Sequence, residues 1–95
     1  MVLEIARFAV LAGRENDFVA AFHEARGLLA ATVGFRSARM TRGVESPSRF
    51  VLIVEWDSLE AHTENFRKSD RFPRWRELIG PFFDGDPDVE HWVDV

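Results

Sequence analysis

The side chain best suited to chemistry in this chain is His62, on the apolar face of a predicted helix that also carries Leu59 and Phe66. A histidine titrates near neutral pH, so in an apolar pocket His62 could act as a general base in proton transfer. The alternative is a half-buried histidine that is hydrogen-bonded to a backbone carbonyl or to a partner subunit. Asn65, on a neighbouring face, could hydrogen-bond a substrate oxygen, although most such asparagines are only solvated.

Large aromatic side chains close to these residues in the sequence could form the walls of a pocket for a flat ligand. Trp56 ends a predicted strand, and Trp75 lies on the inward stripe of a predicted helix. Phe66 and Phe72 are further candidates for substrate contact. Aromatic residues at helical spacing also fill hydrophobic cores, so the alternative role for all four is packing in the core without ligand contact.

Arg39 is the candidate for binding an anionic group. It falls in a predicted strand over residues 35–43, where strict alternation places it on the same face as Phe35. An interface salt bridge is the alternative role for this side chain.

The composition excludes several kinds of site. The chain has no cysteine, which excludes disulfides, thiolate metal sites and cysteine nucleophiles. Its histidines, His23, His62 and His91, are far apart and form no metal-binding pair motif. We expect His23 to be solvated and His91 to lie at a subunit contact. No nucleotide-binding or serine-hydrolase motif is present. We therefore expect neither a metal nor a cofactor.

Charge and hydropathy narrow the possible partners and the cellular location of the protein. The net charge is −4, and the basic residues are scattered among acidic ones, which argues against nucleic acid as a partner. No apolar run approaches the roughly 20 residues of a membrane span, and the N-terminus resembles no signal peptide. We expect a cytoplasmic protein with one domain over residues 1–95.

Periodicity predicts six elements that position these residues. Strands are expected over residues 2–11, 35–43, 49–56 and 88–95, and a helix over residues 15–31. Asp57 and Glu60 form a capping-box pattern that opens the second helical region. That region restarts at Ser69–Asp70 and stops at Gly80. The order is the ferredoxin-like β-α-β-β-α-β plan, an α+β fold with a four-stranded antiparallel sheet.

The strand over residues 49–56 is apolar on both faces. Phe50, Leu52, Val54 and Trp56 share one face, while Val51 and Ile53 lie on the other. The predicted helices can cover only one face of the sheet. We therefore expect a homodimer in which the uncovered sheet faces pack together.

The sequence between Phe50 and His62, FVLIVEWDSLEAH, resembles the antibiotic biosynthesis monooxygenase domain family. The segment Ser69-Asp70-Arg71-Phe72 and Trp75 continue the likeness, as do Gly34-Phe35 and the segment from Pro87 to Trp92. The resemblance spans nearly the whole chain. It implies a dimeric α+β barrel with a pocket between helices and sheet.

The same resemblance implies the expected activity. The family includes cofactor-free oxygenases of aromatic polyketides, haem-degrading enzymes and isomerase-like relatives. For this chain we expect a cofactor-independent monooxygenase of a small aromatic or polyketide-type substrate. In that scheme His62 takes a phenolic proton, and the resulting anion transfers an electron to O₂ without metal or flavin.

Two departures from family patterns qualify this expectation. The haem-degrading relatives use a histidine and an asparagine where this chain has Arg76 and Ala6, which argues against haem. The cofactor-free oxygenases use a tyrosine among their pocket residues, and this chain has none. The alternative is therefore a module of the same fold that binds a small hydrophobic ligand, or only dimerises, without catalysis.

Overall fold

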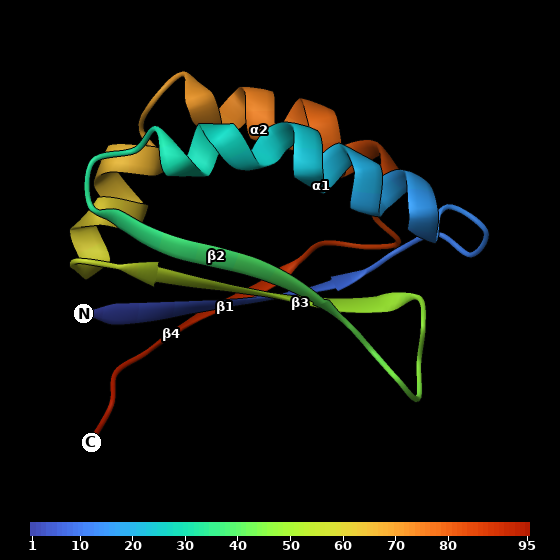
Figure 1. Ribbon diagram of the computed structural model, residues 1–95. Helices are drawn as coiled ribbons and strands as arrows, with labels where there is room; N and C mark the ends of the chain where they lie inside the picture. Colours follow the sequence, from blue (N-terminus) through green and yellow to red (C-terminus); the bar gives the residue numbers. More distant parts are fainter.

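One four-stranded antiparallel sheet is covered on one face by the helices (Figure 1). The computed structural model describes residues 1–95. The strands are Val2–Ala9 (β1), Phe35–Arg42 (β2), Arg49–Trp56 (β3) and Asp88–Trp92 (β4). The helices are Glu15–Ala30 (α1) and Arg71–Ile79 (α2), with a π-helix at Ala61–Phe66 (η1) and a 3₁₀ turn at Gly80–Phe82 (η2). No helix combines the length and the apolar character that a membrane span requires.

The strand order β2-β3-β1-β4 confirms the ferredoxin-like plan. β1 lies in the centre of the sheet and pairs with β3 on one side and β4 on the other. In this register Glu4 stands opposite Val54 of β3 and opposite His91 of β4. Side chains opposite each other in a ladder project from the same face. The register therefore places Glu4 and His91 together on the helix-covered side.

The core lies between the sheet and α1. The predicted stripe of α1 is confirmed, since all of its members are buried: Phe18, Phe22, Ala25 and Leu29. The predicted alternation of β3 is confirmed as well, because Phe50, Leu52, Val54 and Trp56 are at most 2% exposed. Both elements bury a single face against each other, as their periodicities require. This packing supports the sheet on which the site is built.

A β-bulge near the start of β2 makes one prediction wrong. Phe35 pairs with Trp56, but Ser37 pairs with Glu55, so the register shifts between them. The extra residue moves Phe35 to the helix-covered face, where its ring meets the edge of Trp56 at 5.8 Å. Arg39, opposite Ile53, stays on the other face. Phe35 and Arg39 therefore do not share a face, because a bulge breaks the period-two alternation.

The helical segment after β3 begins one residue later than the capping pattern predicts. Ser58, rather than Asp57, provides the cap, since its Oγ accepts a hydrogen bond of 3.2 Å from the amide of Ala61. The helix that follows is a π-helix, with the amide of Arg67 bonded to the carbonyl of His62. Leu59, predicted on the inward face, is 41% exposed. The wider π-helical turn spaces the buried residues differently from an α-helix.

Gly34 allows η1 to approach the sheet closely. Its φ is +95°, and a Cβ atom there would lie 2.5 Å from Cβ of Ala61. The carbonyl of Gly34 also accepts a hydrogen bond from the amide of Asp57, which ties the two chain reversals together. Glycine is the residue that tolerates both this φ and this contact. The next residue after Ala61 is His62, so this contact sets the position of the histidine.

The second face of the sheet carries no helix (Figure 1). Leu3, Ile5, Val51 and Ile53 lie on this face and are only partly buried. The strand ends differ slightly from prediction: β1 stops at Ala9 and β4 at Trp92, and Trp92 is 51% exposed. The apolar character of this uncovered face is the feature from which the dimer is proposed.

Candidate functional site

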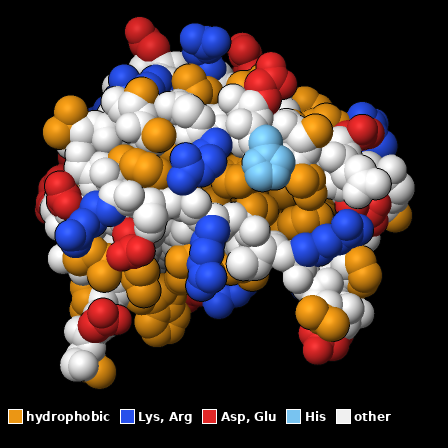
Figure 2. All heavy atoms as spheres, viewed as in Figure 1, with side chains coloured by type: hydrophobic (Ala, Val, Ile, Leu, Met, Phe, Trp, Pro, Cys, Tyr) orange, Lys and Arg blue, Asp and Glu red, His pale blue; other side chains and the backbone are white.

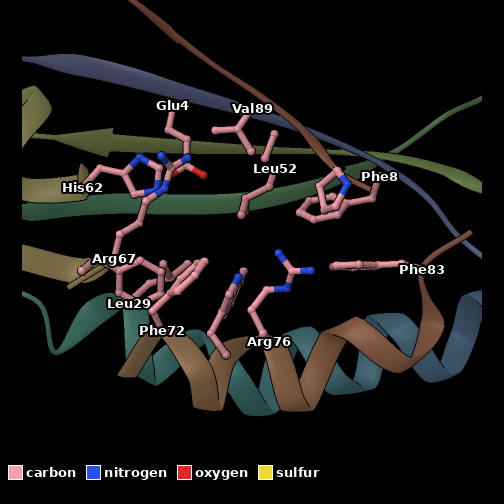
Figure 3. Close-up of a pocket in the computed structure, with 14 residues that line it drawn as sticks. Glu4, Phe8, Leu29, Leu52, His62, Arg67, Phe72, Arg76, Phe83 and Val89 are labelled. Atoms are coloured by element: carbon pink, nitrogen blue, oxygen red, sulfur yellow. The ribbon is translucent and has the colours of Figure 1, made fainter. Parts of the chain in front are cut away.

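A cavity of about 430 Å³ lies between the helices and the sheet (Figure 3). Its volume falls within the roughly 300–1,000 Å³ typical of small-molecule sites. Most of its wall is apolar, with a few polar groups gathered toward one end in Figure 3. The lining residues are Glu4, Ala6, Phe8, Leu29, Leu52, His62, Phe66, Arg67, Phe72, Trp75, Arg76, Phe83, Pro87 and Val89.

His62 enters this cavity from η1 and is held against Trp56. The two rings stack with centroids 5.4 Å apart and planes inclined by 14°. Phe66, one turn later, also stacks on the imidazole, with centroids 6.2 Å apart and planes inclined by 24°. Only 3% of His62 is exposed. The imidazole is therefore fixed in orientation, with its two nitrogens directed at specific partners.

Glu4 is the first of these partners. It is 5% exposed, and its Oε1 lies 3.3 Å from Nε2 of His62. The same oxygen accepts a hydrogen bond of 3.0 Å from the indole nitrogen of Trp56. Figure 3 shows the carboxyl directed from β1 toward His62 and the cavity. A carboxyl group thus stands at the wall of an aromatic cavity with two ring nitrogens beside it.

His91 is the second partner of His62. Its Nε2 lies 2.7 Å from Nδ1 of His62, a hydrogen bond in which either ring can donate, depending on the tautomers. His91 is half-buried on the edge strand β4 and does not line the cavity. Glu4, His62 and His91 therefore form a continuous chain of polar contacts, of which the one between the two rings is a hydrogen bond. We name this chain the Glu-His-His chain.

Burial sets the protonation states at the centre of this chain. Desolvation raises the pKa of Glu4 from 4.5 to about 7, against the opposing effects of the Trp56 hydrogen bond and the charge of Arg67. Desolvation lowers the pKa of His62 from 6.5 to about 3, with repulsion from Arg67 and His91 adding to it. At neutral pH the 3.3 Å contact between the two groups thus involves a neutral imidazole and is not an ion pair. The pKa of His91 is also lowered, by partial burial and then by Arg67.

Two arginines bring positive charge to the cavity. Arg67 follows η1 and reaches toward His62, and Arg76 projects from α2 with its guanidinium 5.4 Å from the ring of Phe83 (Figure 3). Neither has a carboxylate within ion-pair distance. Arginines without a protein counter-charge at a cavity wall are suited to bind an anion.

The structure brings four of the predicted site residues together. His62, Phe66, Phe72 and Trp75 all line the cavity. Trp56, predicted to contact substrate, is completely buried behind His62 and does not line it. It supports His62 and Glu4 instead.

The other two predicted residues lie elsewhere. The side-chain amide of Asn65 points away from the cavity and donates to the carbonyl of Val33 at 3.0 Å. Because η1 is a π-helix, the three-residue spacing does not place Asn65 beside His62. Arg39 lies on the uncovered sheet face, in a groove that Ile5 and Ile53 also line. Its strand β2 also borders a second groove, next to α1, where Figure 2 shows hydrophobic side chains flanked by basic ones. The predicted grouping of Asn65 and Arg39 with the pocket is therefore wrong.

Sequence reasoning missed Glu4, Arg67 and Arg76 as site residues, and placed His91 outside the site. A signal for Glu4 was present, since it alternates in phase with Ala6 and Phe8, which are core residues. An acid on the buried face of a central strand is rare without a specific role. No comparable signal marks the arginines, because exposed helix positions commonly carry them.

The acid and imidazole groups do not converge on one point. His62 stands between Glu4 and His91, and no group of three or more acidic or histidine side chains is arranged to hold a metal ion. The arrangement is suited to moving a proton rather than to binding a cation.

The antibiotic biosynthesis monooxygenase family matches residues 1–78 of the chain. Over all 95 residues the chain is 35% identical to the uncharacterized protein YczJ of Bacillus subtilis, and the match covers 100% of both. A crystal structure from Bordetella bronchiseptica, described provisionally as an antibiotic biosynthesis monooxygenase, is 37% identical. That match has a TM-score of 0.96 and covers 99% of this chain and 96% of the other.

A more distant structure belongs to a protein of described activity. SnoaB from Streptomyces nogalater, a cofactor-independent oxygenase, matches with a TM-score of 0.84 at 17% identity. The match covers 98% of this chain and 91% of SnoaB. At this identity the likeness establishes a shared fold alone.

Proposed function

This chain belongs to the antibiotic biosynthesis monooxygenase family, and we propose that it is a cofactor-independent oxygenase of a small hydroxylated aromatic compound. The observation that carries the proposal is the buried carboxyl of Glu4 at the wall of an aromatic cavity, with a pKa raised to about 7. A general base works best when its pKa lies near the working pH. The cofactor-independent oxygenase activity described for SnoaB, a relative in fold, adds support.

Glu4 replaces His62 as the proposed base. With a pKa of about 3, His62 holds an added proton too weakly to abstract one efficiently at neutral pH. Glu4 exists as both acid and carboxylate near pH 7, so its carboxylate can accept the phenolic proton. The role left to His62 is to contact Oε1 of Glu4, from which its Nε2 lies 3.3 Å away. The proposed catalytic residue is therefore the acid on β1, with His62 beside it.

The cavity walls favour the anion that deprotonation produces. Phe66, Phe72 and Trp75 provide flat apolar surfaces for an aromatic ring. Arg67 and Arg76 supply positive charge without protein counter-ions, and charge-assisted hydrogen bonds to an oxyanion are about twice as strong as neutral ones. Stabilisation of the phenolate lowers the barrier to its formation.

The reaction needs no electron donor other than the substrate. The phenolate transfers one electron to O₂, and the resulting radical and superoxide combine at a ring carbon that carries hydrogen. Protonation gives a hydroperoxide, and loss of water from it gives the quinone. One oxygen atom stays in the product and the other leaves as water, so a phenol and O₂ become a quinone and H₂O. The substrate supplies all the electrons that reduce the oxygen.

We further propose that two copies pack through the uncovered sheet face. Leu3, Ile5, Val51 and Ile53 form an apolar surface there that no helix covers. A small domain without disulfides gains stability when such a surface is buried. Sedimentation at micromolar concentration tests this: a folded lone protomer would contradict it.

Oxygen uptake is the direct test of the proposed activity. Purified protein is mixed with naphthol, anthrone and hydroquinone compounds, and O₂ consumption is followed together with ¹⁸O incorporation from ¹⁸O₂. We expect one labelled oxygen per quinone, with turnover lost in Glu4→Gln and retained in the control His23→Gln, which alters an exposed histidine of α1. Saturable binding of these compounds without oxygen uptake would instead support a ligand-binding module.

A further inference from the structure

We propose that Glu4, His62 and His91 form a proton relay that connects the cavity with the outer edge of the sheet. Glu4 faces the bound ligand, His62 passes the proton on, and His91 releases it to water. The identity of the ligand rests on the proposed function, but the relay itself is a property of the unliganded protein. It can therefore be tested without any substrate.

The architecture of the sheet holds the three groups in line. Glu4 and His91 are ladder partners on β1 and β4, so their side chains project from the same face. His62 reaches them from η1, with Nε2 at 3.3 Å from the carboxyl and Nδ1 at 2.7 Å from His91. Glu4 and His62 line the cavity, whereas His91 does not and is only half-buried. The Glu4–His62 contact and the hydrogen bond between the two rings thus lead from the cavity wall outward.

The protons balance in a single concerted transfer. Before transfer, Glu4 is a carboxylic acid and both imidazoles carry their proton on Nδ1. The Glu4 proton then moves to Nε2 of His62, the Nδ1 proton of His62 moves to Nε2 of His91, and the Nδ1 proton of His91 passes to water. Afterwards Glu4 is a carboxylate and both rings carry their proton on Nε2. Each transfer switches both tautomers, so the rings must return to the first tautomer before the next proton moves.

The charged groups around the relay favour release rather than storage of the proton. Arg67, which follows η1, is the cation that acts on all three members. Arg76 of α2 lines the same cavity, while α1 and β3 contribute no titratable group to that lining, only Leu29 and Leu52. Positive charge close to His91 disfavours an imidazolium there, so the arriving proton passes on to solvent.

Nuclear magnetic resonance of the free protein tests the relay. With only three histidines, protein labelled with ¹⁵N in the imidazoles gives six ring-nitrogen signals, and ¹³C labelling reports the Glu4 carboxyl. We expect a scalar coupling across the hydrogen bond between Nδ1 of His62 and Nε2 of His91. We also expect both rings to change tautomer with the same midpoint as the Glu4 carboxyl.

Two variants separate a relay from a merely structural contact. In Glu4→Gln the shared tautomer change of His62 and His91 should disappear, while the ring-nitrogen signals of His23 stay in place. In His91→Gln the coupling between the rings should be lost, although the Glu4 carboxyl still titrates. The relay is overturned if no coupling is observed, or if His91 keeps its wild-type titration and tautomers in Glu4→Gln. Failure of oxygen uptake alone would overturn the proposed function and leave this result untouched.

Discussion

The Nε2 atom of His62 lies 3.3 Å from Oε1 of Glu4, in a part of the protein where both side chains are almost fully buried. Burial shifts the two pKa values in opposite directions, up for the acid and down for the imidazole. The two groups therefore change the free energy of unfolding with pH in opposite directions, and replacing each residue in turn separates the two effects.

Replacement of Glu4 by glutamine should make the protein less sensitive to rising pH. The folded pKa of Glu4 is raised from 4.5 to about 7, so its contribution to stability is complete below pH 4.5 and is lost as the pH rises through 7. Relative to Glu4→Gln, the wild-type protein should lose at most about 3 kcal/mol of unfolding free energy across this window. Urea unfolding at several pH values measures the difference. A constant difference from pH 4.5 to 8 would show that Glu4 titrates normally.

Replacement of His62 by glutamine should make the protein less sensitive to acid. The folded pKa of His62 is lowered from 6.5 to about 3, so stability is lost as the pH falls from 6.5 toward 3. Between pH 4.5 and 6.5 the effects of Glu4 and His62 oppose each other. In that window stability should rise with pH in Glu4→Gln and fall with pH in His62→Gln. Parallel curves for the two variants in the same unfolding series would refute this assignment.

Removal of the Arg67 charge should weaken binding of an anionic aromatic ligand. Arg67 lines the cavity with no carboxylate at ion-pair distance, so Arg67→Gln removes a charge-assisted contact to the ligand worth about 1–3 kcal/mol. We expect roughly a tenfold or greater rise in Kd for a naphtholate-type ligand, measured by calorimetry, and little change for a neutral analogue. Arg74→Gln is the matched control, since Arg74 is exposed on α2 and lies outside the cavity. Equal effects of the two substitutions would argue against anion binding at Arg67.

Substitution of Gly34 should disturb the site through the backbone. In Gly34→Ala the new Cβ would lie 2.5 Å from Cβ of Ala61 at a φ of +95°, which costs about 1–3 kcal/mol. The shift of η1 should also change the His62 ring-nitrogen signals. Gly27→Ala is the control, because nothing lies within 4 Å of that position in α1 and alanine favours the helix. Thermal unfolding that ranks Gly34→Ala as stable as Gly27→Ala would contradict this packing.

The sequence predicted the fold closely because the fold depends on periodicity. The stripe of α1 and the alternation of β3 both describe a buried face, and hydrophobic burial enforces them. The bulge in β2 escaped prediction because nothing in the residues from Phe35 to Ser37 marks an inserted position. Arg39 was consequently predicted to share a face with Phe35, which the bulge moves to the opposite face.

Only part of the candidate site could be predicted, because some of its contacts depend on strand register and on the π-helix. His62 and its aromatic neighbours could be found, because they lie on helical segments whose inward faces are periodic. The contact between His62 and His91 depends on the register of β4 against β1, which local sequence does not specify. Asn65 was misplaced because a π-helix changes the angle between residues three apart.

Both the proposed oxygenase and the proposed relay require that Glu4, a buried acid at the cavity wall, titrates near neutral pH. A ¹³C titration of glutamate carboxyl signals tests it most directly, with the Glu4 signal assigned by its absence in Glu4→Gln. We predict a midpoint near pH 7, accompanied by changes in the His62 ring signals. A midpoint near 4.5, with no response from His62, would contradict the assignment of Glu4 as the base and as the first group of the relay.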